Sequence, residues 1–271
     1  MIDAHLHVWK ADLDFPNPAA TTVSSASQVP VELLEQYMAE FSVDRAVIVQ
    51  PLYPGEDNSY VTEVANALPD KFAAVCVVDP RRPGAADELE KWVVNHGAKG
   101  LRLRPRVPEE AACYGDDSTF ELWERIESLK VVVNVLGGFE FINQTRRMAQ
   151  RFPSVPIILD HMAHPDIEAG EDDWQPILEL CDCENVHIKV SGFPYCSRQD
   201  YPFADCNKLV QSIYDHYGAS RLIWGSDFPH ILLQTGYLRA IKLLERLEVS
   251  WTATDLQLIQ NDNAARLYWG Q

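Results

Sequence analysis

The chain has 271 residues, of which 46% are hydrophobic, and its 40 acidic and 23 basic residues give a formal net charge of −17 with histidines neutral. This composition suffices for one large or two small globular domains and excludes collagen-like, low-complexity and largely disordered chains. The acidic balance argues against nucleic acid and anionic membranes as partners, because both would be repelled.

Eight short apolar runs rich in β-branched residues alternate with amphipathic segments along the chain. The runs lie at 2–7, 45–50, 72–78, 100–104, 131–135, 155–160, 186–190 and 222–226. The amphipathic segments lie near 31–40, 58–68, 84–96, 117–128, 141–152, 173–183, 205–217 and 234–247. Strands that alternate with helices form parallel βαβ units, and eight such units match a (β/α)8 barrel. The pattern predicts an α/β fold, a single TIM barrel domain over residues 1–271.

Two flanking segments complete this architecture. Residues 10–30 are rich in proline, serine, threonine and alanine, and we expect them to form a long loop over the catalytic mouth. Residues 254–268 predict a C-terminal helix under the barrel, with Thr254 and Gln257 at capping-box spacing. A doubly wound open sheet is the competing architecture, but the glycine-rich phosphate turn that usually follows its first strand is absent from the sequence.

The cellular location is read from the start of the chain and from its cysteines. The first residues lack the basic and apolar layout of a signal peptide, and no apolar stretch is long enough to cross a membrane. A cytoplasmic location is therefore expected. The six scattered cysteines are unlike a disulfide framework and indicate reduced thiols. Cys181 and Cys183 could clip a metal ion, but no second pair follows at zinc-site spacing, which favours a structural role.

Three predicted strands end in side chains capable of chemistry. In the first, His5 and His7 alternate with apolar residues, so both imidazoles face one side of the strand. The sixth run leads to His161 and the eighth to Asp227. Barrel active sites lie at the carboxyl ends of the strands, which favours catalysis over a solvated strand end or, for Asp227, a cap on a following turn. His164, just beyond the sixth run, could equally be a turn residue.

The fourth predicted strand carries Arg102, Arg104 and Arg106 at every second position. Guanidinium groups bind carboxylates through paired hydrogen bonds, so this cluster in an acidic chain indicates a small anionic substrate. The alternative is that one or two of them pair with acidic residues inside the protein, which we expect of Arg106 at least. Arg102 and Arg104 are the predicted substrate-binding arginines.

Three motifs, spread in order over nearly the whole chain, resemble the amidohydrolase superfamily. They are Asp3-Ala4-His5-Leu6-His7-Val8-Trp9, Leu159-Asp160-His161-Met162 and Trp224-Gly225-Ser226-Asp227-Phe228-Pro229. The resemblance is to the branch of metal-dependent hydrolases related to amidohydrolase 2, which includes pyrone-dicarboxylate lactonase, sulfomuconolactone hydrolase, sugar lactonases and aminocarboxymuconate-semialdehyde decarboxylase. Members of this family are (β/α)8 barrels, as the periodicity also predicts.

The resemblance implies roles for individual residues. It makes Asp227 the base that takes a proton from the attacking water, with His161 as a second catalytic residue. It makes Arg102 the residue that binds a substrate carboxylate. His5 and His7 could hold a divalent metal ion, zinc or manganese, together with Asp227.

Asn134 is a departure from the family pattern. It stands in the fifth strand, where the decarboxylases and zinc-dependent relatives carry a metal-ligating histidine. An amide is a poor ligand for zinc, so the departure argues against a tightly held ion, and we assign Asn134 to substrate binding instead. Without an ion, the histidines could polarise a carbonyl group by donating hydrogen bonds.

These residues together predict a hydrolase that opens a small, carboxylated or sugar-derived lactone by attack of water on its carbonyl. Two alternatives remain open. The first is a metal-dependent decarboxylase of an unsaturated carboxylic acid, which needs the full set of metal ligands. The second is a non-catalytic barrel that binds a metabolite.

Overall fold

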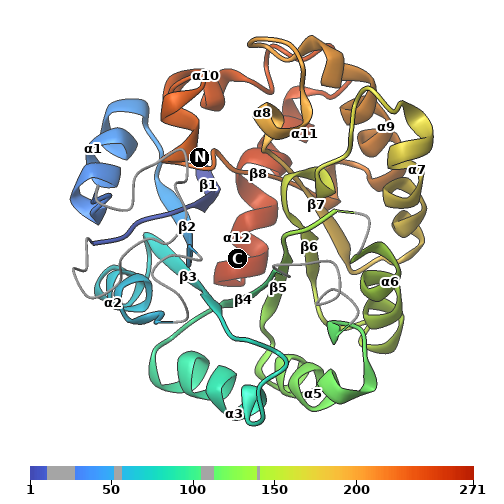
Figure 1. Cartoon of the computed structure of the whole chain (residues 1–271). Coiled ribbons are helices and arrows are strands. Elements are labelled where there is room, and N and C mark those ends of the chain that lie inside the picture. Colours follow the sequence, from blue (N-terminus) through green and yellow to red (C-terminus); the bar gives the residue numbers. More distant parts are fainter. Residues whose placement is uncertain (11–27, 52–56, 105–112, 139–140) are drawn as a thin grey trace.

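The computed structural model describes residues 1–10, 28–51, 57–104, 113–138 and 141–271. Eight parallel strands follow one another around one sheet in the order of the sequence, with helices outside them (Figure 1). The strands are β1 (Ile2–Leu6), β2 (Arg45–Val49), β3 (Phe72–Val77), β4 (Gly100–Leu103), β5 (Val132–Val135), β6 (Ile157–Leu159), β7 (Val186–Val190) and β8 (Leu222–Trp224). All eight predicted strands are present, and the predicted barrel is confirmed.

The barrel closes where the segment after β8 joins β1. The backbone N–H of His7 donates to the carbonyl of Phe228 at 2.7 Å, and the N–H of Asp227 donates to the carbonyl of His5 at 2.8 Å. Because these are backbone bonds, closure of the barrel itself places Asp227 beside the two histidines of β1. The loop predicted at 10–30 starts from the same end, but most of it, like Arg106, lies outside the described residues.

Helices cover the outside of the barrel between successive strands (Figure 1). They are α1 (Val31–Phe41), α2 (Ser59–Ala67), α3 (Ala85–Glu90), α5 (Phe120–Leu129), α6 (Ile142–Arg151), α7 (Glu171–Glu179), α9 (Asn207–Tyr217) and α10 (Tyr237–Lys242). Each coincides with a predicted amphipathic segment. The last segment, predicted near 234–247, is helical only from Tyr237, because Gly236 at φ 83° interrupts the helical backbone.

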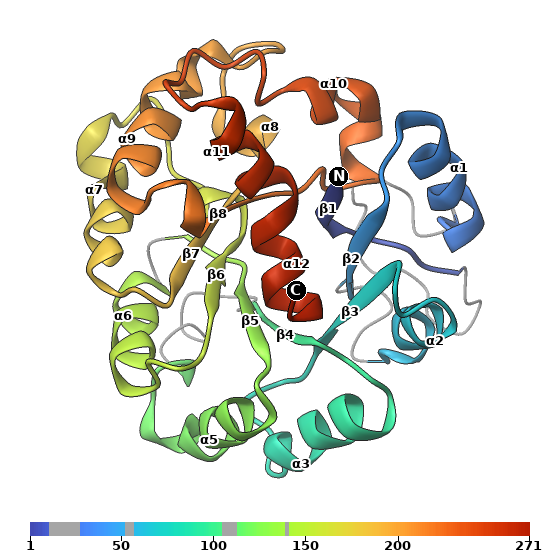
Figure 2. The same cartoon turned by 180° about the vertical axis from the view of Figure 1, so that it is seen from behind.

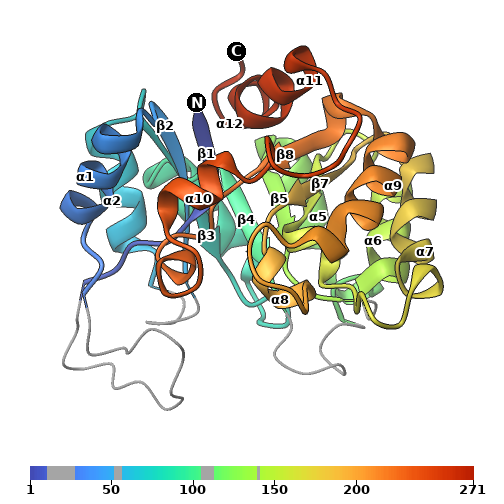
Figure 3. The same ribbon diagram turned by 90° about the horizontal axis from the view of Figure 1, so that it is seen from above.

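The C-terminal segment closes the end of the barrel at which the strands begin, as predicted. Helices α11 (Ala253–Gln257) and α12 (Asn263–Trp269) lie across that end (Figures 2 and 3). Tyr268 of α12 packs against the apolar side chains inside the barrel. The predicted cap is wrong: Thr252 and Asp255 form the capping box, and Thr254 already lies within the helix.

One short helix has no counterpart in the sequence-based prediction. Helix α8 (Phe193–Cys196) follows β7, at the end of the barrel opposite α12 (Figure 3). Four residues are too few for a hydrophobic period to be recognised, and the segment therefore has the sequence appearance of a loop. This helix contributes to the candidate active site.

Candidate active site

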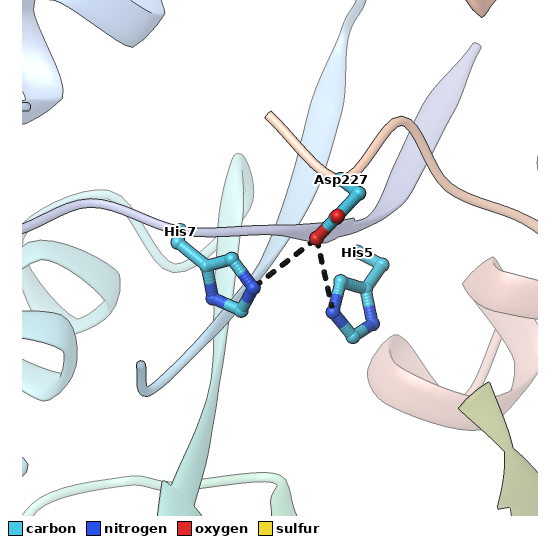
Figure 4. Close-up of side chains that lie close together, drawn as sticks. All are labelled: His5, His7 and Asp227. Carbon is cyan, nitrogen blue, oxygen red and sulfur yellow. Dashed lines mark ion pairs between the residues drawn. The ribbon is translucent and has the colours of Figure 1, made fainter. Parts of the chain in front are cut away.

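His5, His7 and Asp227 meet at the carboxyl ends of β1 and β8. The Oδ1 atom of Asp227 lies 3.3 Å from Nε2 of His7 and 3.7 Å from Nε2 of His5 (Figure 4). Both imidazoles point toward the same carboxylate oxygen, and all three side chains are buried. The structure therefore brings Asp227 to His5 and His7, which lie more than 200 positions away in the sequence.

A close approach of two backbones lets Asp227 reach this position. A Cβ atom on Gly225 would lie 2.6 Å from Cβ of His5, so only glycine fits there. Asp3 stabilises the segment after β8. Its carboxylate accepts hydrogen bonds from the backbone N–H of Ser226 and from the hydroxyl of Tyr237, both at 2.9 Å. β1 has a register shift between Asp3 and Leu6, so its side chains do not alternate regularly, and Asp3 contacts Tyr237 of α10.

His161 reaches the site from an unusual turn after β6. The four residues from His161 to His164 all have positive φ, between 51° and 60°. A left-handed backbone costs a non-glycine residue about 1–2 kcal/mol. His161 is held by a 2.8 Å contact between its Nδ1 and Oγ of Ser191, and its ring centre lies 4.6 Å from that of His5. The predicted grouping of His161 with His5 is thus present in the structure.

Gly192 leaves the space that this turn occupies, which leads to a testable prediction. A Cβ atom there would lie 2.5 Å from Cβ of His161, and Gly192 itself has φ 70°. We expect Gly192→Ala to displace the imidazole and to lower kcat/KM about a hundredfold, since displacements near 1 Å have effects of that size. Gly170→Ala is the matched control, because Gly170 has φ 83° but nothing within 4 Å. Equal losses in both variants would contradict the proposed displacement of His161.

A buried network of charges lies beneath the histidines. Nζ of Lys189 donates to Oδ1 of Asp160 at 2.7 Å and lies 3.1 Å from Nδ1 of His5. Nε of Arg102 lies 3.8 Å from Oδ2 of Asp160, too far for a hydrogen bond. Lys189 and Asp160 are both fully buried. Neither was predicted as a site residue, although a lysine inside the apolar run of β7 is a signal that could have identified it.

Asn134 lies beside this network. Its amide nitrogen is 3.4 Å from Oδ1 of Asp160, and its amide oxygen accepts a hydrogen bond from Tyr268 of α12 at 3.0 Å. Both ends of the amide are thus in contact with protein groups. The predicted contact between Asn134 and a substrate stays a prediction.

The hydrogen bonds of the two β1 histidines fix which nitrogen of each carries the proton. Nδ1 of His7 lies 2.7 Å from the carbonyl of Val49, which only accepts hydrogen bonds, so this nitrogen carries a proton. An ammonium group only donates, so Lys189 donates to Nδ1 of His5 and places the His5 proton on Nε2. Burial lowers the pKa of His5 to about 3, which keeps this imidazole neutral.

Asp227 is ionised in this environment. Burial alone would raise the pKa of Asp227, but the hydrogen bond with His7 and the nearby His161 hold that pKa below its usual value. Burial also lowers the pKa of His161. The site therefore combines a carboxylate base with the neutral imidazoles of His5 and His161 at neutral pH.

Tyr195 of α8 is a fourth neighbour of Asp227, and it was not predicted from the sequence. Its hydroxyl donates to Oδ2 of Asp227 at 2.5 Å, and its ring packs edge-on against those of His161 and His164. Gly192, Tyr195 and Asp227 line one cavity beside α8. A single tyrosine in an apparent loop has no sequence signal that would assign it to the site.

The rim of the site is formed by further side chains at the strand ends. Arg104, directly after β4, is exposed. Burial lowers the pKa of His164 and of His230, and the positive charge of Arg104 lowers both further. The ring of His230 also lies 5.6 Å from that of His7, centre to centre. Arg104 is thus at the mouth of the barrel, whereas Arg102 is buried.

The three clustered residues fit a divalent metal ion in kind and spacing. His5, His7 and Asp227 each offer one ligand atom, and these atoms lie within 4.8 Å of one another. Two imidazole nitrogens and a carboxylate oxygen are a donor set that suits zinc or manganese. Nε2 of His5 is buried and has no hydrogen-bond partner within the part of the chain that the structure describes. The proton that Lys189 places on this nitrogen opposes an ion, as does the amide of Asn134 in the place of a further histidine.

Comparisons with known proteins show what the chain is similar to. The family model described as amidohydrolase matches residues 2–269. The chain is 30% identical to an L-fucono-1,5-lactonase of Burkholderia ambifaria over 84% of this chain and 80% of that protein. It is 24% identical to a 4-sulfomuconolactone hydrolase of Hydrogenophaga intermedia over 84% of this chain and 74% of that protein. A crystal structure of an amidohydrolase from Burkholderia multivorans with bound zinc shares the fold, with a TM-score of 0.85 and 23% identity over 99% of this chain and 98% of that chain.

Proposed function

The chain belongs to the amidohydrolase family, and we propose that it is a lactonase in which Asp227 takes a proton from a water molecule that attacks the carbonyl of a small cyclic ester. The observation that carries this proposal is the buried Asp227 carboxylate at the carboxyl ends of the strands, with the imidazoles of His5 and His7 directed at one of its oxygens. Two relatives are named L-fucono-1,5-lactonase and 4-sulfomuconolactone hydrolase. Lactones are cyclic esters, so these names support hydrolysis of an ester as the reaction.

The proposed mechanism uses the histidines to stabilise negative charge on the carbonyl oxygen. The proton on Nε2 of His5 gives the site a hydrogen-bond donor, and the ring of His161 lies near enough to face the same oxygen. A preorganised donor of this kind is typically worth about 10²–10³ in rate. A bound divalent ion would supply the same polarisation as a Lewis acid, with His5, His7 and Asp227 as its ligands.

The proposed substrate is a carboxylated or sugar-derived lactone of small size. Arg102, at the end of β4, is the buried guanidinium group available to a substrate carboxylate, and Arg104 offers a second one at the mouth. The test is a panel of carboxylated, sugar-derived and unsubstituted lactones, assayed for acid release. Release of carbon dioxide from unsaturated carboxylic acids is assayed on the same sample. Hydrolysis of a lactone supports the proposal, whereas decarboxylation alone, or binding without turnover, would overturn it.

Removal of the Arg102 side chain tests the anionic part of the substrate. Arg102→Ala is expected to raise KM for carboxylated lactones at least about tenfold more than for neutral ones, because only an anion gains from the guanidinium group. Asp160 keeps its hydrogen bond to Lys189, so the variant should remain folded. Arg125→Ala, which removes a surface arginine 3.3 Å from Asp87, is the control. Equal increases in KM for both kinds of lactone would assign Arg102 a structural role.

We propose that the metal site binds zinc or manganese with modest affinity. His5 has to lose the proton on Nε2 before that nitrogen can bind an ion, and Asn134 offers no strong additional ligand. The protein is therefore expected to retain less than one equivalent of metal after purification and to lose it during prolonged chelation. Metal analysis and a binding isotherm at pH 7 measure this directly. One equivalent that survives chelation would contradict modest affinity.

The cytoplasmic location expected from the sequence remains a proposal. The six cysteines are free, as in a reducing compartment. Within the described residues, no helix is long and apolar enough to cross a membrane. The single-domain organisation over residues 1–271 is likewise a proposal, supported by one continuous eight-stranded sheet.

A further inference from the structure

Tyr195 links a solvent-exposed position to the proposed base. Its residue is 43% exposed, yet its hydroxyl donates to Oδ2 of Asp227 at 2.5 Å. The edge of its ring rests on His161, with 5.6 Å between the ring centres. The phenol therefore connects the open side of the site to the proposed base.

The two oxygens of Asp227 have different neighbours. Oδ1 faces Nε2 of His7 at 3.3 Å and Nε2 of His5 at 3.7 Å, on the side proposed to polarise the carbonyl. Oδ2 accepts the hydroxyl of Tyr195. Since a carboxylate oxygen accepts more than one hydrogen bond, Oδ2 can also accept the proton of an attacking water.

Lactone opening poses a second proton-transfer problem, because the ring oxygen leaves as an alkoxide unless it is protonated. We propose that Tyr195 is the catalytic residue that protonates this leaving oxygen, using the proton that Asp227 has taken from water. This inference rests on the proposed lactonase function. The attacking oxygen and the ring oxygen are bonded to the same carbon in the tetrahedral intermediate, so both lie next to the Asp227–Tyr195 pair.

The proton transfers balance within one turnover. Water gives one proton to Oδ2 of Asp227 and forms the new C–O bond. The C–O bond of the ring then breaks, and its electron pair remains on the leaving oxygen. That oxygen takes the hydroxyl proton of Tyr195, while the oxygen of Tyr195 takes the proton from Asp227. The products are an acid and an alcohol, and both residues return to their starting forms.

The hydroxyl of Tyr195 carries its proton in the resting site, where it donates to Oδ2 of Asp227. Proton delivery matters most for a poor leaving group. A sugar alkoxide needs the proton, whereas a phenolate is stable enough to leave without it.

The experiment compares leaving groups in wild-type protein and Tyr195→Phe. The two substrates are an aldono-1,5-lactone, which releases an alkoxide, and 3,4-dihydrocoumarin, which releases a phenolate. Tyr195→Phe should lower kcat on the aldonolactone at least about tenfold more than on dihydrocoumarin, because general acid catalysis is worth about 10²–10⁴. Tyr214→Phe is the matched control, since the hydroxyl of Tyr214 donates to Asp255 at 2.9 Å far from the site.

The outcomes separate this inference from the proposed function. If the wild-type protein opens neither lactone nor any other in the panel, the lactonase proposal itself fails. If it opens both and Tyr195→Phe loses the same factor on each, Tyr195 only orients Asp227 and the inference is overturned. Activity on dihydrocoumarin alone would also overturn it, because no proton relay is then needed.

A second measurement applies if the protein hydrolyses only lactones whose leaving group is an alkoxide. Rates are measured in mixtures of light and heavy water. Two protons that move together give wild-type protein a curved dependence on the deuterium fraction, and Tyr195→Phe should give a straight line. Curvature that persists in the variant would overturn the relay.

Discussion

Asp227→Asn is expected to lower kcat on any accepted lactone at least about a hundredfold while the protein stays folded, because the amide keeps the shape of the side chain but cannot take a proton from water. The backbone bond from Asp227 N–H to the carbonyl of His5 is retained in the variant, so closure of the barrel does not depend on the carboxylate. Asp255→Asn removes another carboxylate that accepts a tyrosine hydroxyl, and serves as the control. Activity within about threefold of wild type would exclude Asp227 as the base.

The pH profile of the wild-type protein checks the same assignment. The pKa of Asp227 lies below its usual value despite burial, owing to His7 and His161. The base is active when deprotonated, so kcat/KM should stay level as the pH falls from about 7 to about 5. An acid limb near pH 6 would instead indicate another group, such as Asp3, whose pKa burial raises to about 6.

Periodicity was sufficient to predict the fold because each strand of the barrel is a short apolar run between amphipathic helices. All eight strands are found at the predicted places, and β7 has the predicted bounds. The strands β6 and β8 are shorter than predicted. The chain stays buried as far as Asp160 and Ser226 after the backbone has left the strand. The sequence does not show where the strand ends, because the left-handed turn at His161 and the close approach at Gly225 depend on tertiary contacts.

The candidate site was only partly predictable for a similar reason. His5, His7 and Asp227 were identified because they interrupt apolar runs at strand ends, where a barrel carries its active site. Lys189 was overlooked because it lies within β7, and only the partner Asp160 makes a buried lysine tolerable. Tyr195 depends on where α8 places its hydroxyl, which no pattern in the sequence indicates.

Lys189→Met is expected to be among the most destabilising single substitutions in this protein, at about 3–5 kcal/mol near neutral pH, because it leaves a buried carboxylate without its main partner. Lys189 and Asp160 are fully buried and lie 2.7 Å apart. The remaining cation, Arg102, is 3.8 Å from the other oxygen of Asp160 and makes no hydrogen bond to it. Urea or thermal unfolding of the variant and the wild-type protein measures the loss. A loss below about 1 kcal/mol would show that Asp160 does not need Lys189.

The pH dependence of this loss identifies Asp160 as its cause. Burial raises the pKa of Asp160, but in the wild-type protein Lys189, His5 and Arg102 together hold that pKa well below its usual value. Asp160 then contributes stability above its unfolded pKa, which is lost only as the pH falls through the lower folded value. Without Lys189, burial raises the folded pKa above the unfolded one, so the variant is increasingly destabilised as the pH rises from about 4 to about 8. The difference in stability between the two proteins should therefore be smaller at pH 5 than at pH 8.

The double variant Lys189→Met with Asp160→Asn has no buried carboxylate left without a partner, so it should recover part of the stability at pH 8. A difference that stays constant with pH, or a double variant no more stable than Lys189→Met, would assign the loss to packing of the lysine side chain instead.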